Sequence, residues 1–161
     1  MRKRAIAGAV LVVFAAGAVA DAMTVTVYTD RTAWEAALDG PFATETFVDD
    51  LLNPQVSYVS TASGHVNPAL ACYQDVLTST NPNDPMTTWS FTPPMTAYGG
   101  TWTLAGPGGG GNALLVYIID DADGSEVYAG AIANSTAGGF WGLIADTPFI
   151  AVRLVGSVRC V

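Results

Sequence analysis

The chain has 161 residues, half of them hydrophobic and only 12% charged, with 14 acidic residues against 6 basic ones and a net charge of −8. This length suits a single domain, and the apolar fraction is too high for a disordered chain. The acidic balance argues against binding to nucleic acid or to anionic membranes, because both need a basic surface.

The first 22 residues have the features of a secretory signal peptide. The basic run Arg2-Lys3-Arg4 precedes sixteen uncharged residues, Ala5–Ala20, and small side chains allow cleavage after Ala20 or Ala22. A membrane anchor is the alternative, but a spanning helix needs roughly 20 predominantly apolar residues. We therefore expect a secreted, extracellular protein with a mature domain of residues 23–161 and no membrane span in the mature chain.

Removal of this segment changes the charge balance. From Met23 onward the chain keeps three arginines, no lysine and thirteen carboxylates, for a net charge of −10. The carboxylates are spread along the sequence, so the acidity favours solubility rather than one binding site.

Two elements are predicted at the start of the mature chain. Met23–Tyr28 alternates β-branched residues with a period of two, which predicts a strand. Asp30 is a favourable N-cap for a helix over Arg31–Leu38, in which apolar residues form one stripe. Gly40 and Pro41 then predict the end of this helix.

The rest of the chain predicts short strands separated by turns. The predicted strands cover Ala43–Val48, Gln55–Thr61, Thr87–Thr92, Met95–Leu104, Ala113–Ile119, Ser125–Ala133, Gly139–Ala145 and Phe149–Val155. Pro93-Pro94, Asp121–Gly124 and Asp146–Pro148 are turn signals between neighbouring strands. The segment Asn67–Pro85 gives no clear pattern.

Many short strands without intervening helices favour antiparallel β structure over a parallel α/β fold. The four Trp residues supply large side chains for a core. We therefore expect an all-β fold. More closely, we expect the single domain of residues 23–161 to form a two-sheet antiparallel β-sandwich, jelly-roll-like, with one short N-terminal helix.

The only cysteines are Cys72 and Cys160. In an exported protein an even pair is expected to form a disulfide. A zinc site is disfavoured, because the single His65 does not complete the usual four Cys or His ligands. A Cys72–Cys160 bridge closes a loop of about 88 residues and stabilises by at most about 4–5 kcal/mol in the chain-entropy model. Two independent thiols are the alternative.

Four carboxylates surround one predicted turn: Asp120, Asp121, Asp123 and Glu126. Oxygen-rich turns suit Ca²⁺, which takes about 6–8 oxygen ligands. The EF-hand spacing is not met, because placing Gly124 at the sixth position puts Ile119 at the first. The simpler explanation is that turns favour Asp for their own backbone hydrogen bonds. Calcium stands as a hypothesis beside it.

No catalytic motif is recognisable. Nucleophilic hydrolysis needs a base beside a Ser or Cys, and the only histidine, His65, lies in a predicted turn. No G-x-S-x-G motif is present. A pair of carboxylates suits a glycosidase, but any acidic chain contains such pairs. We expect a protein that is not an enzyme, with no catalytic residues and no cofactor besides the calcium considered above.

Aromatic side chains raise the alternative of sugar binding. Trp34, Trp141 and Tyr98 are the candidate ligand-binding residues, because amphipathic aromatic rings suit half-exposed sites that stack on sugar rings. Core packing is the stronger explanation for Trp89 and Trp102, which alternate in phase with neighbouring apolar residues. An extracellular glycan is therefore a candidate partner, and this hypothesis requires exposed Trp or Tyr side chains in a row or a cleft.

Several motifs along the chain suggest a family. A "T-D-R-x-x-W" opening at Thr29–Trp34 is followed by "E-x-F" at Glu45–Phe47. The segment Phe91–Trp102 then has the pattern F-x-P-P-x-x-A-x-G-G-x-W, and Gly139–Phe149 has G-F-x-G-x-x-x-D-x-P-F. In these motifs the chain resembles exported bacterial surface proteins of the PEP-CTERM (exosortase-sorted) type. The resemblance covers about residues 28–48 and 89–155, at turn and core positions.

The resemblance implies an extracellular β-sandwich without an assigned activity, and it transfers no functional residue. It also implies a further strand, a linker, a Pro-Glu-Pro motif, a transmembrane helix and a basic tail, whereas this sequence ends at Val161 without that sorting tail. Either a secreted relative that needs no sorting or a truncated sequence explains the difference. The leading hypothesis is a non-catalytic secreted or cell-surface β-sandwich with an extracellular matrix or adhesion role. A carbohydrate-binding module and a secreted hydrolase are the alternatives.

Overall fold

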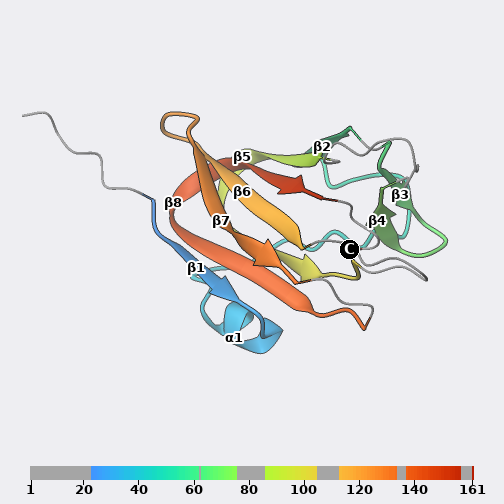
Figure 1. Cartoon of the computed structure of the whole chain (residues 1–161), viewed down its shortest axis with the longest axis horizontal. Helices are drawn as coiled ribbons and strands as arrows, with labels where there is room; N and C mark the ends of the chain where they lie inside the picture. Colours follow the sequence, from blue (N-terminus) through green and yellow to red (C-terminus); the bar gives the residue numbers. More distant parts are fainter. Residues whose placement is uncertain (1–22, 62, 76–85, 105–112, 134–136, 157–160) are drawn as a thin grey trace, which may run out of the picture.

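The computed structural model describes residues 23–61, 63–75, 86–104, 113–133, 137–156 and 161 (Figure 1). The predicted signal peptide and Cys160 lie outside these residues. The described chain consists mostly of antiparallel strands with one short helix, which confirms the predicted all-β class. In chain order the elements are β1 (Val25–Tyr28), α1 (Arg31–Ala36), β2 (Val56–Ser60), β3 (His65–Asn67), β4 (Cys72–Gln74), β5 (Met86–Thr101), β6 (Leu114–Asp120), β7 (Glu126–Ile132) and β8 (Phe140–Val155).

Two antiparallel sheets contain these strands. The larger has the order β2-β5-β8-β6-β7, and β1 pairs with the first part of β8, from Gly142 to Ala145. The smaller consists of β3 and β4. The longest strands, β5 and β8, are therefore paired with each other at the centre of the large sheet.

Both central strands bend. β5 and β8 have 16 residues each and continue through the predicted turns Pro93-Pro94 and Asp146–Pro148, so the prediction of separate strands there is wrong. The register of their pairing shifts between Ser90 and Met95 and again between Met95 and Ala97. Such irregularities bend a strand and tolerate proline, because the ladder is locally interrupted. The predicted turns are exposed corners at which the paired strands change direction together (Figure 1).

The core lies on the inner side of this bent sheet. Trp102 and Trp141 are 2% and 4% exposed, and the Trp102 indole N–H donates to the Trp141 carbonyl at 3.3 Å. Phe91 and Phe149 make an edge contact with ring centroids 6.1 Å apart, across the two strands. The other large buried side chains are Tyr73, Trp89, Leu114, Ile118, Leu143, Val152 and Leu154.

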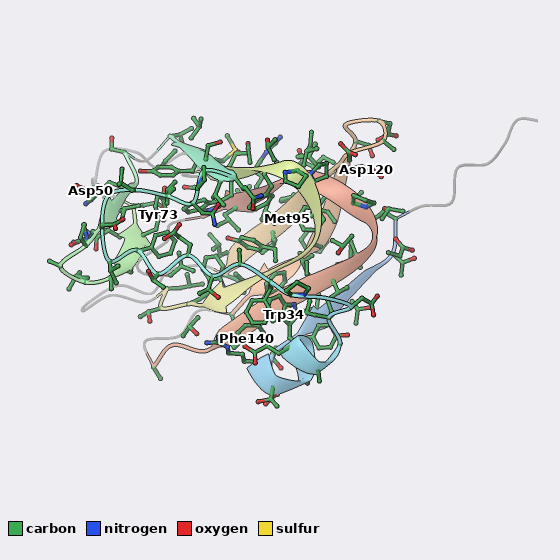
Figure 2. The ribbon with its side chains drawn as sticks, turned by 180° about the vertical axis from the view of Figure 1, so that it is seen from behind. Trp34, Asp50, Tyr73, Met95, Asp120 and Phe140 are labelled. Carbon is green, nitrogen blue, oxygen red and sulfur yellow. The ribbon has the colours of Figure 1, made fainter. Side chains whose placement is uncertain are left out.

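The helix α1 has the predicted cap and anchors itself to the sheet. The side chain of Asp30 accepts a hydrogen bond from the Ala33 backbone N–H at 2.7 Å, as an N-cap does. Trp34 is buried, and its indole N–H donates to the carbonyl of Leu143 in β8 at 3.1 Å. In Figure 2, Trp34 and Phe140 lie together beside α1, and Tyr73 lies at the opposite end of the sheet.

Two short strands are missing from the prediction, and one predicted strand is absent. β3 and β4 have three residues each, too few for an alternation to be recognisable, and His65 opens β3 instead of lying in a turn. The segment Ala43–Val48 is irregular, because Phe47 has a φ of 54°, a left-handed value incompatible with a strand. The segment of residues 37–55, between α1 and β2, is named here the strap.

Candidate functional site

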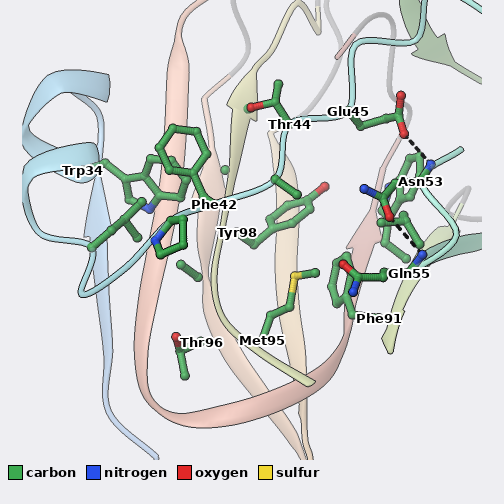
Figure 3. A pocket seen from close by; sticks show the side chains of 18 of the residues that line it. Trp34, Phe42, Thr44, Glu45, Asn53, Gln55, Phe91, Met95, Thr96 and Tyr98 are labelled. Atoms are coloured by element: carbon green, nitrogen blue, oxygen red, sulfur yellow. Dashed lines mark hydrogen bonds between the residues drawn. The ribbon is translucent and has the colours of Figure 1, made fainter. Parts of the chain in front are cut away.

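A cleft of about 740 Å³ lies between the strap and the second half of β5 (Figure 3). Its volume is typical of small-molecule sites, which measure about 300–1,000 Å³. Most of its lining is apolar or aromatic, with neutral polar side chains among it. The lining includes Trp34, Phe42, Thr44, Asn53, Gln55, Trp89, Met95, Thr96, Tyr98 and Phe140.

Three aromatic rings form the end of the cleft nearest α1. The centroid of the Trp34 ring lies 5.6 Å from that of Phe42 and 5.5 Å from that of Phe140. Such tilted and edge-on contacts add to the stabilisation that burial gives. Phe42 is 46% exposed, so this cluster presents one open ring to solvent.

Two glycines make room for these rings. Gly99 of β5 and Gly142 of β8 are direct partners across the strand pair. A Cβ on Gly142 would lie 2.9 Å from Phe140 Cζ and 3.1 Å from Trp34 Cδ1, and a Cβ on Gly99 would lie 3.0 Å from Phe140 Cζ. One glycine from each of the two longer motifs, Gly99 and Gly142, therefore has a packing function beside the cleft.

The strap takes its shape from Glu45. One carboxylate oxygen accepts the backbone N–H groups of Thr46 and Phe47 at 2.9 and 3.2 Å, and the other accepts that of Asn53 at 2.8 Å. These bonds stabilise the left-handed turn at Phe47, whose ring packs 6.0 Å from that of Trp89. Because both oxygens of Glu45 hold backbone groups, this carboxylate is a positioning residue for the strap.

Neutral polar groups line the opposite side of the cleft. Asn53 accepts a hydrogen bond from the Gln55 backbone N–H at 3.0 Å, and Figure 3 shows the hydroxyl of Tyr98 directed toward the side on which these residues lie. Burial raises the pKa of Tyr98 above its usual value, so the phenol is a neutral hydrogen-bonding group. The described chain also offers no acceptor to the buried indole N–H of Trp89, which lines the same cleft.

The candidate ligand-binding residues are only partly brought together. Trp34 and Tyr98 both line the cleft, and Trp141 is a core residue away from its lining. All four Trp residues fall in the described chain, and each is at most 6% exposed, so they form no exposed row. The most exposed ring of the cleft belongs to Phe42, which sequence reasoning missed because the irregular strap carries no periodic signal.

The four carboxylates considered for calcium are not assembled into a site. Asp120 accepts the Ala122 backbone N–H at 2.7 Å, and Asp123 accepts that of Ser125 at 2.8 Å, which lowers the pKa of Asp123. Asp121 is exposed, and Glu126 pairs with Arg153 at 2.7 Å. Within the described ranges no group of three or more His, Cys, Asp or Glu side chains is arranged to hold a metal ion. Asp120 and Asp123 therefore hold the backbone of the β6–β7 turn.

The predicted disulfide is only half described. Cys72 is buried in β4 and is not a free thiol, whereas Cys160 lies outside the described residues. The residues that follow the two cysteines, Tyr73 and Val161, exchange both backbone hydrogen bonds at 3.2 Å. The Cys72–Cys160 pairing therefore stays a prediction.

A buried polar cluster connects the small sheet to the large one. Asp75 is 6% exposed, and one of its oxygens accepts hydrogen bonds from Ser60, Tyr73 and Thr87 at 3.1–3.2 Å. Burial raises the pKa of Tyr73. His65 is exposed in β3, and no hydrogen bond between its side chain and a nucleophile occurs in the described part of the chain.

No described helix is long and apolar enough to cross a membrane. Comparisons with known proteins give no match: no family model fits the sequence, and no curated protein or solved structure is detectably similar.

Proposed function

We propose that this protein is a non-catalytic, exported β-sandwich with an adhesion or extracellular matrix role, and that it holds its partner in the cleft beneath the strap. The cleft itself is the observation that carries the proposal. It combines a volume of about 740 Å³ with an aromatic end, apolar walls and neutral polar groups. Such a composition is typical of binding sites that recognise a ligand by shape and a few hydrogen bonds.

The chemistry of the cleft supports binding rather than catalysis. Of its three charged lining residues, Glu45 is occupied by three backbone N–H groups, Arg31 pairs with Glu35 at 2.7 Å, and Asp39 is exposed on the strap. A general acid or base has to reach a substrate proton. Because the bonds of Glu45 are committed to the strap, the described lining offers Asp39 alone and no pair of free carboxylates.

Export and the PEP-CTERM-like family are part of the same proposal. The basic and apolar N-terminal segment supports export, and an exported chain supports the Cys72–Cys160 bridge. The residues that carry the resemblance have structural roles here. Asp30 caps α1, Glu45 shapes the strap, and Gly99 and Gly142 accommodate aromatic rings.

Carbohydrate binding is the second candidate, and one observation favours it. Trp34, Phe42 and Phe140 form a continuous aromatic cluster at the end of the cleft. Thr44 and Thr96 are exposed hydroxyl side chains of the same cleft, suited to hydrogen bonds with sugar hydroxyls.

A binding screen with matched variants tests the proposal. The mature chain is applied to a glycan array and to an array of random synthetic peptides, with and without EDTA. Phe42→Ser removes the exposed ring of the cleft, and Leu51→Ser removes a 79% exposed apolar side chain on the same strap but outside the cleft lining. We expect retained probes to lose at least about tenfold in affinity, about 1.4 kcal/mol, with Phe42→Ser only. If no retained probe distinguishes the two variants, the cleft is not the binding site and the proposal fails.

A further inference from the structure

We infer that the occupant of the cleft is an extended, uncharged polypeptide segment of a partner protein, which binds as an additional strand along the open edge of β5. This inference rests on the proposed function, because it names what the cleft holds. Strand addition takes its affinity from main-chain hydrogen bonds and its specificity from pockets for alternate side chains. The cleft offers both.

The first step is that half of β5 lacks a second neighbour. Residues Thr87–Phe91 pair with β2 on one side, and Met86–Ser90 pair with β8 on the other. Beyond the corner, Met95–Thr101 pairs with β8 alone within the described chain. The strap passes along this second half without pairing with it.

The second step identifies which backbone groups face the open edge. In an antiparallel pair, residues that exchange hydrogen bonds alternate with residues that do not. The Trp102 N–H donates to the carbonyl of Gly139 at 2.8 Å, and this pair continues the register of Gly100 with Trp141 and of Tyr98 with Leu143. The bonds of Tyr98, Gly100 and Trp102 therefore point toward β8. Those of Ala97, Gly99 and Thr101 point away from it.

The third step is that these outward groups lie in the cleft. The lining includes the whole run Pro94–Thr101, and therefore Ala97, Gly99 and Thr101 with it. No described residue forms a hydrogen bond with their backbone groups from the open side. They are an unpaired row of donors and acceptors at two-residue spacing, which is the template that an added strand requires.

The remaining lining determines the chemistry of the segment. Met95, Tyr98 and Phe42 offer apolar contacts to alternate side chains of a bound peptide. The indole N–H of Trp89 has no acceptor within the described chain, and a carbonyl oxygen of the peptide would supply one. The lining residues contributed by the second half of β5, Pro94–Thr101, are all uncharged. Of the charged lining residues on other segments, Arg31 and Glu45 are paired or hydrogen-bonded and Asp39 is exposed on the strap, so the strip along β5 favours an uncharged segment. Strands rise about 3.3 Å per residue, so a peptide of about seven residues matches Met95–Thr101.

The experiment selects uncharged heptapeptides displayed on phage against the mature protein, with counter-selection on the Phe42→Ser variant. Backbone amide exchange of the wild-type protein is then measured by NMR with the selected peptide. We expect exchange at Ala97, Gly99 and Thr101 to slow at least tenfold. Exchange at Tyr98 and Gly100, which already bond to β8, should change little. An analogue N-methylated at alternate residues should bind at least tenfold more weakly to the unaltered protein, which excludes misfolding as the cause.

Three results overturn the inference. The first is that the selection recovers no peptide whose binding depends on Phe42. The second is that the peptide slows amide exchange at Tyr98 and Gly100 as much as at Ala97, Gly99 and Thr101. The third is that the N-methylated analogue binds as tightly as the parent peptide. If a glycan binds in a Phe42-dependent way while no peptide does, strand addition is wrong and the proposed function survives. If Phe42→Ser and Leu51→Ser behave alike with every probe, both fail.

Discussion

The two halves of β5 are one continuous strand in two different environments. Before the corner, Thr87, Trp89 and Phe91 are buried in strict alternation, and Thr87–Ser90 pairs with both β2 and β8. After the corner the alternation disappears, and Gly99 and Gly100 follow one another on an edge that, among the described residues, pairs with β8 alone. The first half therefore stabilises the core, and the second leaves backbone and side-chain groups available for binding. The difference teaches that the neighbouring strands, rather than the strand itself, decide which part of β5 is covered and which part borders the cleft.

The largest expected contrast between the halves is in core stability. Trp89→Ala removes a 3% exposed indole from the covered half and should cost about 3–5 kcal/mol of unfolding free energy. Phe42→Ala, at the open half, should cost less than about 1 kcal/mol because its ring is 46% exposed. Urea unfolding of the mature protein measures both. Similar losses of unfolding free energy for the two variants would contradict the difference between the covered and the open half of β5.

A smaller effect is expected where the open half meets its aromatic cluster. Gly142→Ala places a methyl group 2.9 Å from Phe140 Cζ and should destabilise by about 1–3 kcal/mol through overpacking. Gly139→Ala is the matched control, since no atom lies within 4 Å of its added Cβ. It should change stability by no more than about 0.5 kcal/mol. Equal effects of the two substitutions would show that packing of the Trp34 and Phe140 rings does not depend on the absence of a side chain at Gly142.

Alkaline pH should destabilise the folded protein through two tyrosines, one beside the first half of β5 and one within the second half. Burial raises the pKa of Tyr73 beside the covered half and of Tyr98 in the open half. Because the folded state holds these protons more tightly, their stabilisation is complete below the unfolded-state pKa of about 10 and is lost as pH rises above it. Urea unfolding above about pH 10 should lose up to about 1.4 kcal/mol per pH unit for each tyrosine.

Phenylalanine variants separate the two tyrosines. Tyr98→Phe should reduce the alkaline slope with little change at neutral pH. Tyr73→Phe should also cost about 1–3 kcal/mol at neutral pH, because its hydroxyl lies 3.1 Å from Asp75 and 2.9 Å from Thr87. An unchanged alkaline slope in both variants would mean that neither phenol stays protonated in the folded protein.

The smallest expected effect concerns the helix that carries Trp34 to the cleft. Asp30→Ala removes the N-cap bond to Ala33 and should cost about 1 kcal/mol. Asp121→Ala, an exposed aspartate in the β6–β7 turn, is the control and should stay within about 0.5 kcal/mol of the wild type. Thermal unfolding compares them, and the cap has no role if Asp30→Ala matches the control.

Local sequence features were sufficient for most of the secondary structure. The predicted strands match β1, β2, β6 and β7 within one or two residues at each end, and the predicted cap at Asp30 is correct. The corners were missed because Pro93-Pro94 and Asp146–Pro148 have the composition of turns. A proline corner inside a strand is indistinguishable from a strand end until the partner strand is seen to bend with it.

The site was predicted less completely than the fold. Trp34 and Tyr98 were recognised as aromatic residues suited to binding, and both line the cleft. Trp141 was grouped with them and belongs to the core. An aromatic residue has the same local sequence signal whether it faces solvent or the interior, so its burial depends on what packs over it.

The sequence by itself determined the composition of this protein and its local structure: an acidic, lysine-free mature chain, a strand-rich pattern, one capped helix and the glycines of its motifs. Only the tertiary structure decided that β5 and β8 bend together, that the strap lies along the second half of β5, and that no other described strand pairs with the far edge of that half. The physical reason is that alternation and capping act between residues a few positions apart. A cleft, in contrast, is formed by segments that the chain brings together from distant positions.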